Sequence, residues 1–577
     1  MVTPDHPRPT FARPTWKTLD GPWEFAVGSS GDRPLASAWD RMIQVPFPPE
    51  SDASGVGLAR CDHPRYRRSF EADVFPGRRW LLHCEGVDQE ARVWVDGQLA
   101  GTHAGGYTPF ALDVTDVLSQ ASTHEVVIAA SDLAHDLEHP RGKQDWHAAP
   151  RKIWYGRSSG IWRTVWLEDV PAVRLESASW TTLDTFGRLQ GAIRLAGWAE
   201  GEALVVEASF GHRGVHLGTV AVEATASFVE LTARLGTAEE ADTPELYWSP
   251  DNPALIDVRL RLLRGADVLD VVEGYTGLRT VGVRDGHLEL NGVALFSRLV
   301  LEQAFWPASH FTAPSLEALR AEAELIRALG FNGLRMHQVT ADPRFLRACD
   351  ELGLMVWADC PAAYVFSQRS LQLTTRTLIE LVDRDRNHPC VVAWVPFNES
   401  WGVPEVASSA QQRRAVSALY ELAKALDPTR LAIGTDGWEN VAGDLVGVHD
   451  YAHDPSVLRA RYGSPQAVAT TLATGRPGGR PVLVAPFAPG TPVVLSEFGG
   501  LSLPRLARSW GYGEVADPDE LVSGVAALVG AVGPSSGLAG FCWTQLSDTL
   551  HEQNGLTWPD RTPKASLVTL AAAIRGG

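Results

Sequence analysis

Residues 391–402 read Val-Val-Ala-Trp-Val-Pro-Phe-Asn-Glu-Ser-Trp-Gly, so an apolar segment runs almost directly into the carboxylate of Glu399. The stretch Pro492-Val-Val-Leu repeats this arrangement, because Ser496 and Glu497 follow it at once. Short apolar runs of this kind are typical of strands that are buried on both faces of a parallel sheet. A carboxylate at the end of such a strand is poorly solvated and therefore needs a partner or a chemical task.

The surrounding sequence alternates helical and strand-like patterns over residues 282–577. Residues 315–329 predict a helix, and short apolar strands are predicted at 333–336, 354–357, 391–395, 492–495 and 540–543. Strands and helices in alternation predict a parallel sheet covered by helices. The length suits a (β/α)₈ TIM barrel, whose functional residues follow the C-terminal ends of its strands.

The N-terminal half has the pattern of antiparallel β-structure. An Asp96-Gly97 turn joins two strand-like runs, and residues 123–130 form another. These features predict a jelly-roll β-sandwich over residues 1–171. Strand-like runs at 203–209 and 254–262 predict an immunoglobulin-like β-sandwich over 172–281.

Composition restricts the class of partner. The 577 residues include 51 Lys plus Arg and 69 Asp plus Glu, giving a net charge of −18. Nucleic acid and anionic membranes bind a concentrated positive field, so neither is expected as a partner. Twenty Trp exceed the usual needs of packing and indicate flat surfaces for ligands or subunit contacts.

The six Cys are scattered and form no zinc-binding pattern, so buried thiols in a reducing compartment are expected, and no metal. The segment 1–11 is polar and Pro-rich, without the apolar core of a signal peptide. Both features predict a cytoplasmic protein. Trp-rich surfaces are compatible with a homo-oligomer.

Glu399 and Glu497 are the candidate catalytic pair. Two carboxylates that face each other across a barrel mouth are the catalytic groups that cleave a glycosidic bond. A glutamate of this kind taken alone is more often a structural hydrogen-bond acceptor, and it is the pair with its aromatic neighbours that favours catalysis.

These motifs resemble glycoside hydrolase family 2, which contains β-galactosidases, β-glucuronidases and β-mannosidases. The resemblance rests on Asn398-Glu399-Ser-Trp-Gly after His388-Pro389, on Ser496-Glu497-Phe-Gly, and on the order of two sandwiches and a barrel. Residues 105–110, 160–168 and 330–335 match further family motifs. The resemblance covers nearly the whole chain.

The resemblance implies a role for each matching residue. Glu399 is the expected general acid/base, Glu497 the nucleophile, and Asn398 a donor to the sugar 2-hydroxyl. Arg335 is expected to lower the pKa of the nucleophile, and Tyr451 to donate to it. The family retains anomeric configuration, which implies carboxyl groups ~5–5.5 Å apart. No cofactor is expected.

Further substrate-binding candidates lie at strand ends or on a loop of the first sandwich, with packing roles as the alternative for each. They are His337, Asp359, Trp401, Asp436, Trp438, Trp543 and Gln545 in the barrel, and Gln144, Asp145 and Trp154 in the loop.

The predicted function is that of a retaining exo-glycosidase acting on terminal neutral glycosides, with a β-galactoside as the leading substrate. No Asn is followed two residues later by Lys, the motif that β-glucuronidases use for the sugar carboxylate, so a glucuronide is disfavoured. The motifs at 436–439, 449–451 and 544–548 resemble a branch that includes enzymes for β-galactofuranosides or α-L-arabinofuranosides, which are close alternatives. A non-catalytic carbohydrate-binding protein is the remaining alternative.

Overall fold

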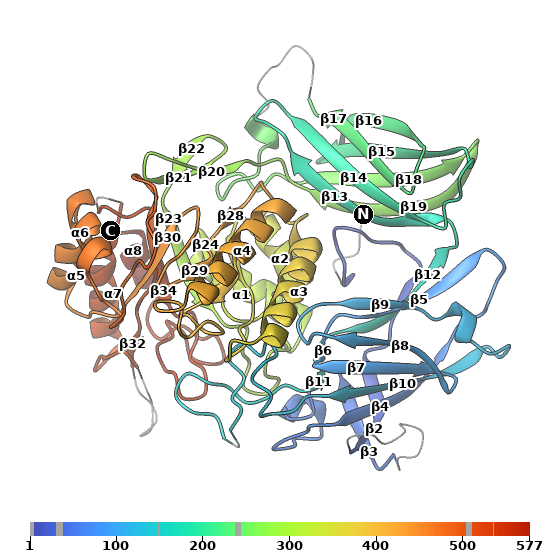
Figure 1. Ribbon diagram of the computed structural model, residues 1–577, viewed down its shortest axis with the longest axis horizontal. Coiled ribbons are helices and arrows are strands. Elements are labelled where there is room, and N and C mark those ends of the chain that lie inside the picture. Colours follow the sequence, from blue (N-terminus) through green and yellow to red (C-terminus); the bar gives the residue numbers. More distant parts are fainter. Residues whose placement is uncertain are drawn as a thin grey trace.

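The computed structural model describes residues 5–29, 39–147, 149–236, 244–503, 511–534 and 536–576. Two β-sandwiches pack against a (β/α)₈ barrel, which forms the C-terminal half of the chain (Figure 1). Residues 1–4 of the segment used to predict location lie outside the described residues. The described part of the chain has no helix that is both long and apolar enough to span a membrane.

The first sandwich pairs a six-stranded with a four-stranded antiparallel sheet. Its core includes Trp23, Phe25 and Tyr66. The Asp96-Gly97 turn joins β7 to β8 as predicted, with both residues at positive φ. The six-stranded sheet has the order β3 (Arg41–Val45), β2 (Gly21–Val27), β4 (Pro64–Glu71), β10 (Thr123–Ser131), β7 (Glu90–Val95), β8 (Gln98–Ala104). The other has the order β1 (Trp16–Thr18), β12 (Val165–Pro171), β5 (Arg78–Cys84), β9 (Phe110–Asp113), while β11 (Gly160–Ile161) pairs with β6 (Val87–Asp88).

The second sandwich has a three-stranded and a four-stranded sheet, as expected for an immunoglobulin-like domain. Phe11, near the start of the chain, also packs in its core. The sheets have the orders β13 (Arg174–Thr182), β14 (Arg188–Ala196), β17 (Phe228–Arg234), and β16 (Val215–Ala224), β15 (Leu204–His212), β18 (Ile256–Arg264), β19 (Asp267–Thr276). The predicted division at 171/172 falls between β12 and β13, whereas that at 281/282 falls after the first residue of the strand Val281–Arg284, and we keep both as a proposal.

A small antiparallel sheet precedes the barrel: β20 (Val281–Arg284), β21 (His287–Leu290), β22 (Val293–Leu295). Eight parallel strands then form the barrel sheet. Their order is β28 (Leu431–Ala432), β26 (Val391–Val395), β25 (Met355–Asp359), β24 (Gly333–Met336), β23 (Ser297–Glu302), β34 (Gly540–Thr544), β31 (Val493–Gly499), β30 (Val446–Asp450). Short pairs at the strand ends are β27 (Phe397–Asn398) with β29 (Thr435–Asp436), and β32 (Leu501–Ser502) with β33 (Gly513–Glu514). The TIM-barrel prediction is confirmed.

Helices surround the sheet, and polar caps fix several of their starts. Ser315 caps the first helix by accepting from the amide of Ala318, which explains why the predicted helix begins there. The helices are α1 (Leu316–Ala328), α2 (Pro343–Leu352), α3 (Gln368–Asp385), α4 (Ala410–Leu426), α5 (Pro455–Tyr462), α6 (Pro465–Thr474), α7 (Pro518–Val532) and α8 (Leu567–Arg575).

Polar contacts hold the first sandwich against the barrel. The Arg163 guanidinium donates to the carbonyl of Ala341 at 2.9 Å, and the Thr340 hydroxyl donates to the carbonyl of Tyr107 at 2.7 Å. The rings of Tyr155 and Trp162 belong to the same buried cluster as the barrel core. The loop of the first sandwich that precedes Tyr155 is therefore fixed at the barrel.

Candidate active site

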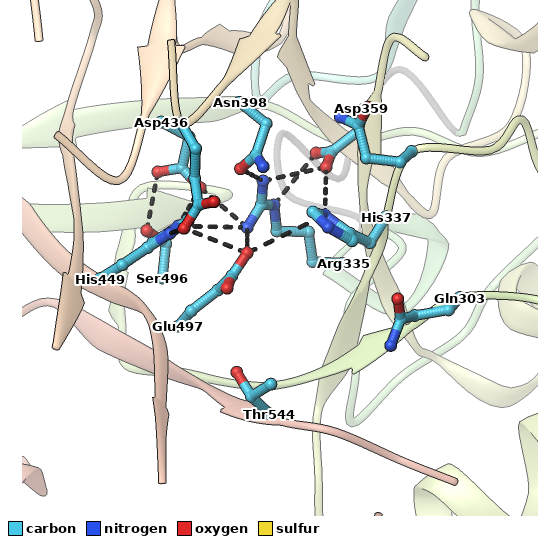
Figure 2. Close-up of polar contacts among 12 residues, drawn as sticks. Gln303, Arg335, His337, Asp359, Asn398, Asp436, His449, Ser496, Glu497 and Thr544 are labelled. Carbon is cyan, nitrogen blue, oxygen red and sulfur yellow. Dashed lines mark hydrogen bonds and ion pairs between the residues drawn. The ribbon is translucent and has the colours of Figure 1, made fainter. Parts of the chain in front are cut away.

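Arg335 is the centre of a buried polar cluster at the C-terminal ends of the barrel strands (Figure 2). Its side chain is 0% exposed and contacts three carboxylates and the side-chain amide of Asn398. It makes a two-pronged contact with Asp359, with Nε to Oδ1 at 3.0 Å and Nη2 to Oδ2 at 2.9 Å. Nη1 lies 2.8 Å from Oε1 of Glu497 and 3.0 Å from Oδ2 of Asp436, and Nη2 donates to Oδ1 of Asn398 at 2.7 Å.

Glu497 receives polar contacts on both carboxylate oxygens. Arg335 contacts Oε1, and the Tyr451 hydroxyl donates to Oε2. Nδ1 of His337 lies 3.9 Å from Oε1 of Glu497 and 2.9 Å from Oδ2 of Asp359. The cluster thus holds the Glu497 carboxylate in one orientation.

His449 joins the two candidate catalytic glutamates. Its Nδ1 lies 2.8 Å from Oε1 of Glu399, and its Nε2 lies 3.2 Å from Oδ2 of Asp436 and 3.5 Å from Oε1 of Glu497. The Ser496 hydroxyl donates to the other oxygen of Asp436 at 2.7 Å. Because both ring nitrogens face carboxylates, the imidazole is best satisfied when both carry a proton.

The two glutamates are close together and mostly buried. Their side chains are 15% exposed for Glu399 and 6% for Glu497. One carboxylate oxygen of each and one ring nitrogen of His449 all lie within 4.8 Å of one another. These distances could also accommodate a metal ion. However, an imidazole that is protonated on both nitrogens has no lone pair to offer a metal.

The environment shifts the pKa values of the two glutamates in opposite directions. Burial raises the pKa of Glu399, and the contact with His449 only partly offsets this effect. Burial also acts to raise the pKa of Glu497, but His449, His337 and Arg335 outweigh it and lower that pKa. Separated pKa values are what an acid and a nucleophile in one site require.

Neighbouring groups are shifted by the same cluster. The three carboxylates outweigh the burial of His449 and raise its pKa to about 10. Burial, followed by the charge of Arg335, lowers the pKa of His337 well below its usual value. Burial raises the pKa of Asp359 to about 6 despite Arg335. Asp436 is also buried, but Arg335 and His449 hold its pKa below its usual value.

The backbone at the acid/base candidate is strained. Glu399 and Ser400 have φ values of 52° and 59°, in the left-handed region that residues other than glycine rarely adopt. The Ser400 hydroxyl donates to Glu439 at 2.6 Å and stabilises this turn. Strain at consecutive residues is frequent where a side chain must be aimed at a functional site.

Asn398 has an unused donor. Its Oδ1 accepts from Arg335, which fixes the amide, while its Nδ2 is buried and has no hydrogen-bond partner in the described part of the chain. A buried donor without a partner is costly, so the site gains free energy when a ligand oxygen accepts from it.

An aromatic wall extends from the first sandwich to the barrel mouth. The ring of Trp154 lies 5.2 Å from that of Trp401 and 5.0 Å from that of Tyr364, while Trp401 lies 6.1 Å from His337. Trp154, Trp401 and Tyr364 are all partly exposed. Two of the predicted site residues are thus brought together beside the glutamates.

Other predicted site residues lie away from the cluster around Arg335 or are buried by neighbouring side chains. All polar atoms of the Gln144 side chain are bonded inside the sandwich, to Asp88, Tyr107 and the amide of Ser158. These contacts favour the packing role that was the alternative for Gln144. Asp145 orients its own loop by pairing with His147 at 2.8 Å and Arg151 at 3.3 Å.

Two predicted tryptophans differ in accessibility. Trp543 is 0% exposed and packs against Phe498, which favours the packing alternative. Trp438 is partly exposed and packs edge-on against His449. Gln545 lies in a polar network with Gln303, which also follows a barrel strand.

Sequence reasoning missed His449, Gln303, Lys143 and Glu552. His449 lies at the end of β30, two residues before Tyr451, so the strand-end rule could have found it. Lys143 is next to the predicted Gln144, but nothing in a loop sequence indicates which side chain faces the barrel.

Two family models match the chain. "Glycosyl hydrolases family 2, TIM barrel domain" matches residues 281–474, and "Glycosyl hydrolase 2 galactose-binding domain-like" matches residues 46–163. A β-galactosidase of Thermoanaerobacter pseudethanolicus is 28% identical over 343 residues, covering 58% of this chain and 44% of that protein. The chain spans about 44–45% of the length of the first curated relatives.

Solved structures share the fold at low identity. The β-glucuronidase of Bifidobacterium dentium complexed with coumarin-3-O-glucuronide has a TM-score of 0.77 at 19% identity, covering 98% of each chain. A β-galacturonidase of Eisenbergiella tayi bound to galacturonate has a TM-score of 0.75 at 20% identity, again covering 98% of each chain.

The chain has the architecture of a multidomain barrel protein, with two β-sandwiches and a TIM barrel. Paired carboxylates lie at the mouth of that barrel. The family models place the chain within this class of barrel proteins: it belongs to glycoside hydrolase family 2.

Proposed function

We propose that this protein is a retaining exo-glycosidase that hydrolyses terminal neutral glycosides, with a β-galactoside as the leading substrate. The observation that carries the proposal is the pair Glu399 and Glu497, whose carboxylates lie within 4.8 Å and whose pKa values are shifted in opposite directions. This limit joins one oxygen of each carboxylate. It is consistent with the ~5–5.5 Å between the carboxyl groups of retaining enzymes, whereas inverting enzymes keep ~6.5–9.5 Å to fit a water between them.

In the first step Glu497 attacks the anomeric carbon while Glu399 transfers its proton to the leaving oxygen. The raised pKa keeps that proton on Glu399 until it is needed, and the lowered pKa keeps Glu497 ionised. The bond to the aglycone breaks as the glycosyl ester on Glu497 forms. In the second step Glu399, now a carboxylate, takes a proton from the water that attacks the ester.

Asn398 and Tyr451 assist this chemistry. The free Nδ2 of Asn398 is available to the sugar 2-hydroxyl, whose contacts strengthen in the transition state. Tyr451 donates to Oε2 of Glu497 and leaves Oε1 to Arg335, so the attacking carboxylate is held before the substrate arrives.

A panel of 4-nitrophenyl glycosides tests the proposal: β-D-galactopyranoside, β-D-galactofuranoside, α-L-arabinofuranoside, β-D-mannoside and β-D-glucuronide. The uronide is included because relatives named β-glucuronidase share the fold. We expect hydrolysis of a neutral glycoside, and proton NMR should show that the first-formed sugar keeps the anomeric configuration of the substrate. Inversion, or no hydrolysis of any member, would refute the proposal.

A carbohydrate-binding protein without turnover would behave differently. It would bind sugar equally well in the wild type and in E399Q and E497Q, and none of the three would release nitrophenol.

A further inference from the structure

A buried ion pair lies beside the candidate active site. Nζ of Lys143, from the loop of the first sandwich, is 2.9 Å from Oε2 of Glu552, and the two side chains are 3% and 2% exposed. Nζ also donates to Oε1 of Gln303 at 2.6 Å. Gln303 follows β23 and Glu552 follows β34, which are neighbouring strands of the barrel. Three segments that are distant in the sequence thus meet at the C-terminal end of the barrel.

Side-chain contacts connect this pair with the nucleophile. Nε2 of Gln303 donates to Oε1 of Gln545. The preceding residue, Thr544, has its hydroxyl 3.5 Å from that of Tyr451, which donates to Glu497. Figure 2 shows Gln303 and Thr544 on the side of Glu497 opposite Asn398 and Asp436.

The charges of the pair and of the active site influence one another. Burial raises the pKa of Glu552, and the charges of Glu497 and Glu399 raise it further against the effect of Lys143. Lys143 in turn contributes to lowering the pKa of His337. The pair is therefore within electrostatic range of the catalytic carboxylates.

The position of the pair indicates which part of a substrate it meets. Glu399 follows β26, and β25 and β24 separate that strand from β23 in the barrel order. The leaving group must lie at Glu399, which protonates it. A group near β23 and β34 consequently faces the sugar ring rather than the aglycone.

Lys143 has one N–H group, and Glu552 has one carboxylate oxygen, that make no hydrogen bond within the described part of the chain. An ammonium has three N–H groups, and the contacts with Glu552 and Gln303 use two of them. Oε1 of Gln303 is already shared with the Tyr155 hydroxyl, which fixes the amide. Oε1 of Glu552 accepts no hydrogen bond within the described ranges of the chain, because the bonds from Lys143 and Gln303 both end on Oε2. One donor beside one acceptor matches a hydroxyl group.

We propose that Lys143 and Glu552 together bind a hydroxyl of a neutral sugar and exclude a sugar carboxylate from this position. Glu552 already neutralises Lys143, so a uronate would bring a second carboxylate to a site that has one positive charge. This inference rests on the proposed glycosidase function and specifies its substrate class.

The test compares the neutral 4-nitrophenyl glycoside that the wild type hydrolyses fastest with 4-nitrophenyl β-D-galacturonide. We expect K143M to lower kcat/KM on the neutral substrate roughly 10- to 100-fold, because a hydrogen bond to a charged donor is lost. E552Q keeps the shape and leaves Lys143 uncompensated, so the ratio of neutral to uronide kcat/KM should fall about tenfold or more.

K564M is the matched control, because Lys564 forms another buried pair, at 2.6 Å from Asp548, in the same C-terminal part of the barrel. It should lower Tm without changing the ratio. Mono-deoxy analogues of the neutral substrate keep the test decisive if the variants fold poorly. Wild type should discriminate against one of them, and K143R, which keeps the charge, should retain more of that discrimination than K143M.

The outcomes separate this inference from the proposed function. A wild type that hydrolyses no glycoside refutes the function. A wild type that hydrolyses neutral glycosides and all their deoxy analogues with the same kcat/KM overturns only the inference. Folded K143M and E552Q variants that keep the wild-type ratio of neutral to uronide kcat/KM also overturn only the inference. A wild type that prefers the uronide also overturns it.

Discussion

Nδ1 of His449 lies 2.8 Å from Oε1 of Glu399, while Nε2 of the same ring lies 3.5 Å from Oε1 of Glu497. A single buried imidazole thus interacts with both members of the candidate catalytic pair. Because its pKa is raised to about 10, it carries a positive charge at neutral pH and lowers the pKa of each glutamate.

The first prediction concerns the pH profile of H449Q. Loss of the imidazolium should raise the pKa of Glu497, which sets the acidic limb of kcat/KM, and that of Glu399, which sets the alkaline limb. Both limbs should therefore move to higher pH. H388Q is the control, since His388 is also a buried histidine, 2.6 Å from Asp350, but lies before β26 at the other end of the barrel. Limbs that stay in place in H449Q would contradict this role.

The second prediction concerns stability. The pKa of His449 rises from 6.5 to about 10 on folding, so its charge stabilises the folded state fully below pH 6.5 and loses this effect as the pH rises through 10. The Tm difference between wild type and H449Q should be largest below pH 6.5 and should shrink towards pH 10. Calorimetry across this range measures it. A difference that grows with pH would mean that His449 is neutral in the folded protein.

The third prediction concerns the nucleophile. E497A should lose at least about 10⁴-fold in kcat, because no glycosyl ester can form. The truncated side chain leaves space at the anomeric carbon, so added azide should restore turnover and give a glycosyl azide of inverted configuration. NMR of the product is the measurement. E439A, which removes a carboxylate that supports the turn at Ser400, should not give this azide product.

The fourth prediction concerns the acid/base. E399A should lose about 10²–10⁴-fold on substrates with poor leaving groups, which need protonation. Dinitrophenyl glycosides need little protonation, so formation of the glycosyl ester should remain fast and its hydrolysis should become limiting. A burst of dinitrophenol, with an azide product of retained configuration, checks this. An equal loss for all leaving groups would assign the proton transfer to another residue.

Much of the barrel could be predicted because its signals are local. The apolar runs at 333–336 and 391–395 coincide with β24 and β26, and Ser315 marks the start of α1. The glutamates could be predicted for the same reason, since Glu399 follows the end of β26 closely and Glu497 lies in the C-terminal part of β31. Local sequence and the final fold agree at these strands, which are buried on both faces.

The rest of the site depends on contacts between distant residues. Lys143 meets Glu552 across 409 positions, and His449 meets Glu399 across 50. The first pair follows from packing of the sandwich on the barrel and the second from closure of the barrel itself, and neither leaves a pattern in a single sequence. The abundance of Trp was also misleading in part. Seven of the 20 Trp are among the largest fully buried side chains and fill cores and domain contacts: Trp23, Trp162, Trp166, Trp248, Trp357, Trp394 and Trp543.

The fifth prediction concerns the aromatic wall formed by Trp154, Tyr364 and Trp401. This wall lies beside Glu399, where the leaving group must be, so it should stack on an aryl aglycone. W154A should raise KM for a 4-nitrophenyl glycoside about 2- to 10-fold, as expected for one lost aromatic contact. Hydrolysis of the corresponding methyl glycoside should hardly change, because it has no ring to stack. W198A, in the second sandwich, serves as the control. An equal effect of W154A on both substrates would place Trp154 at the sugar rather than at the aglycone.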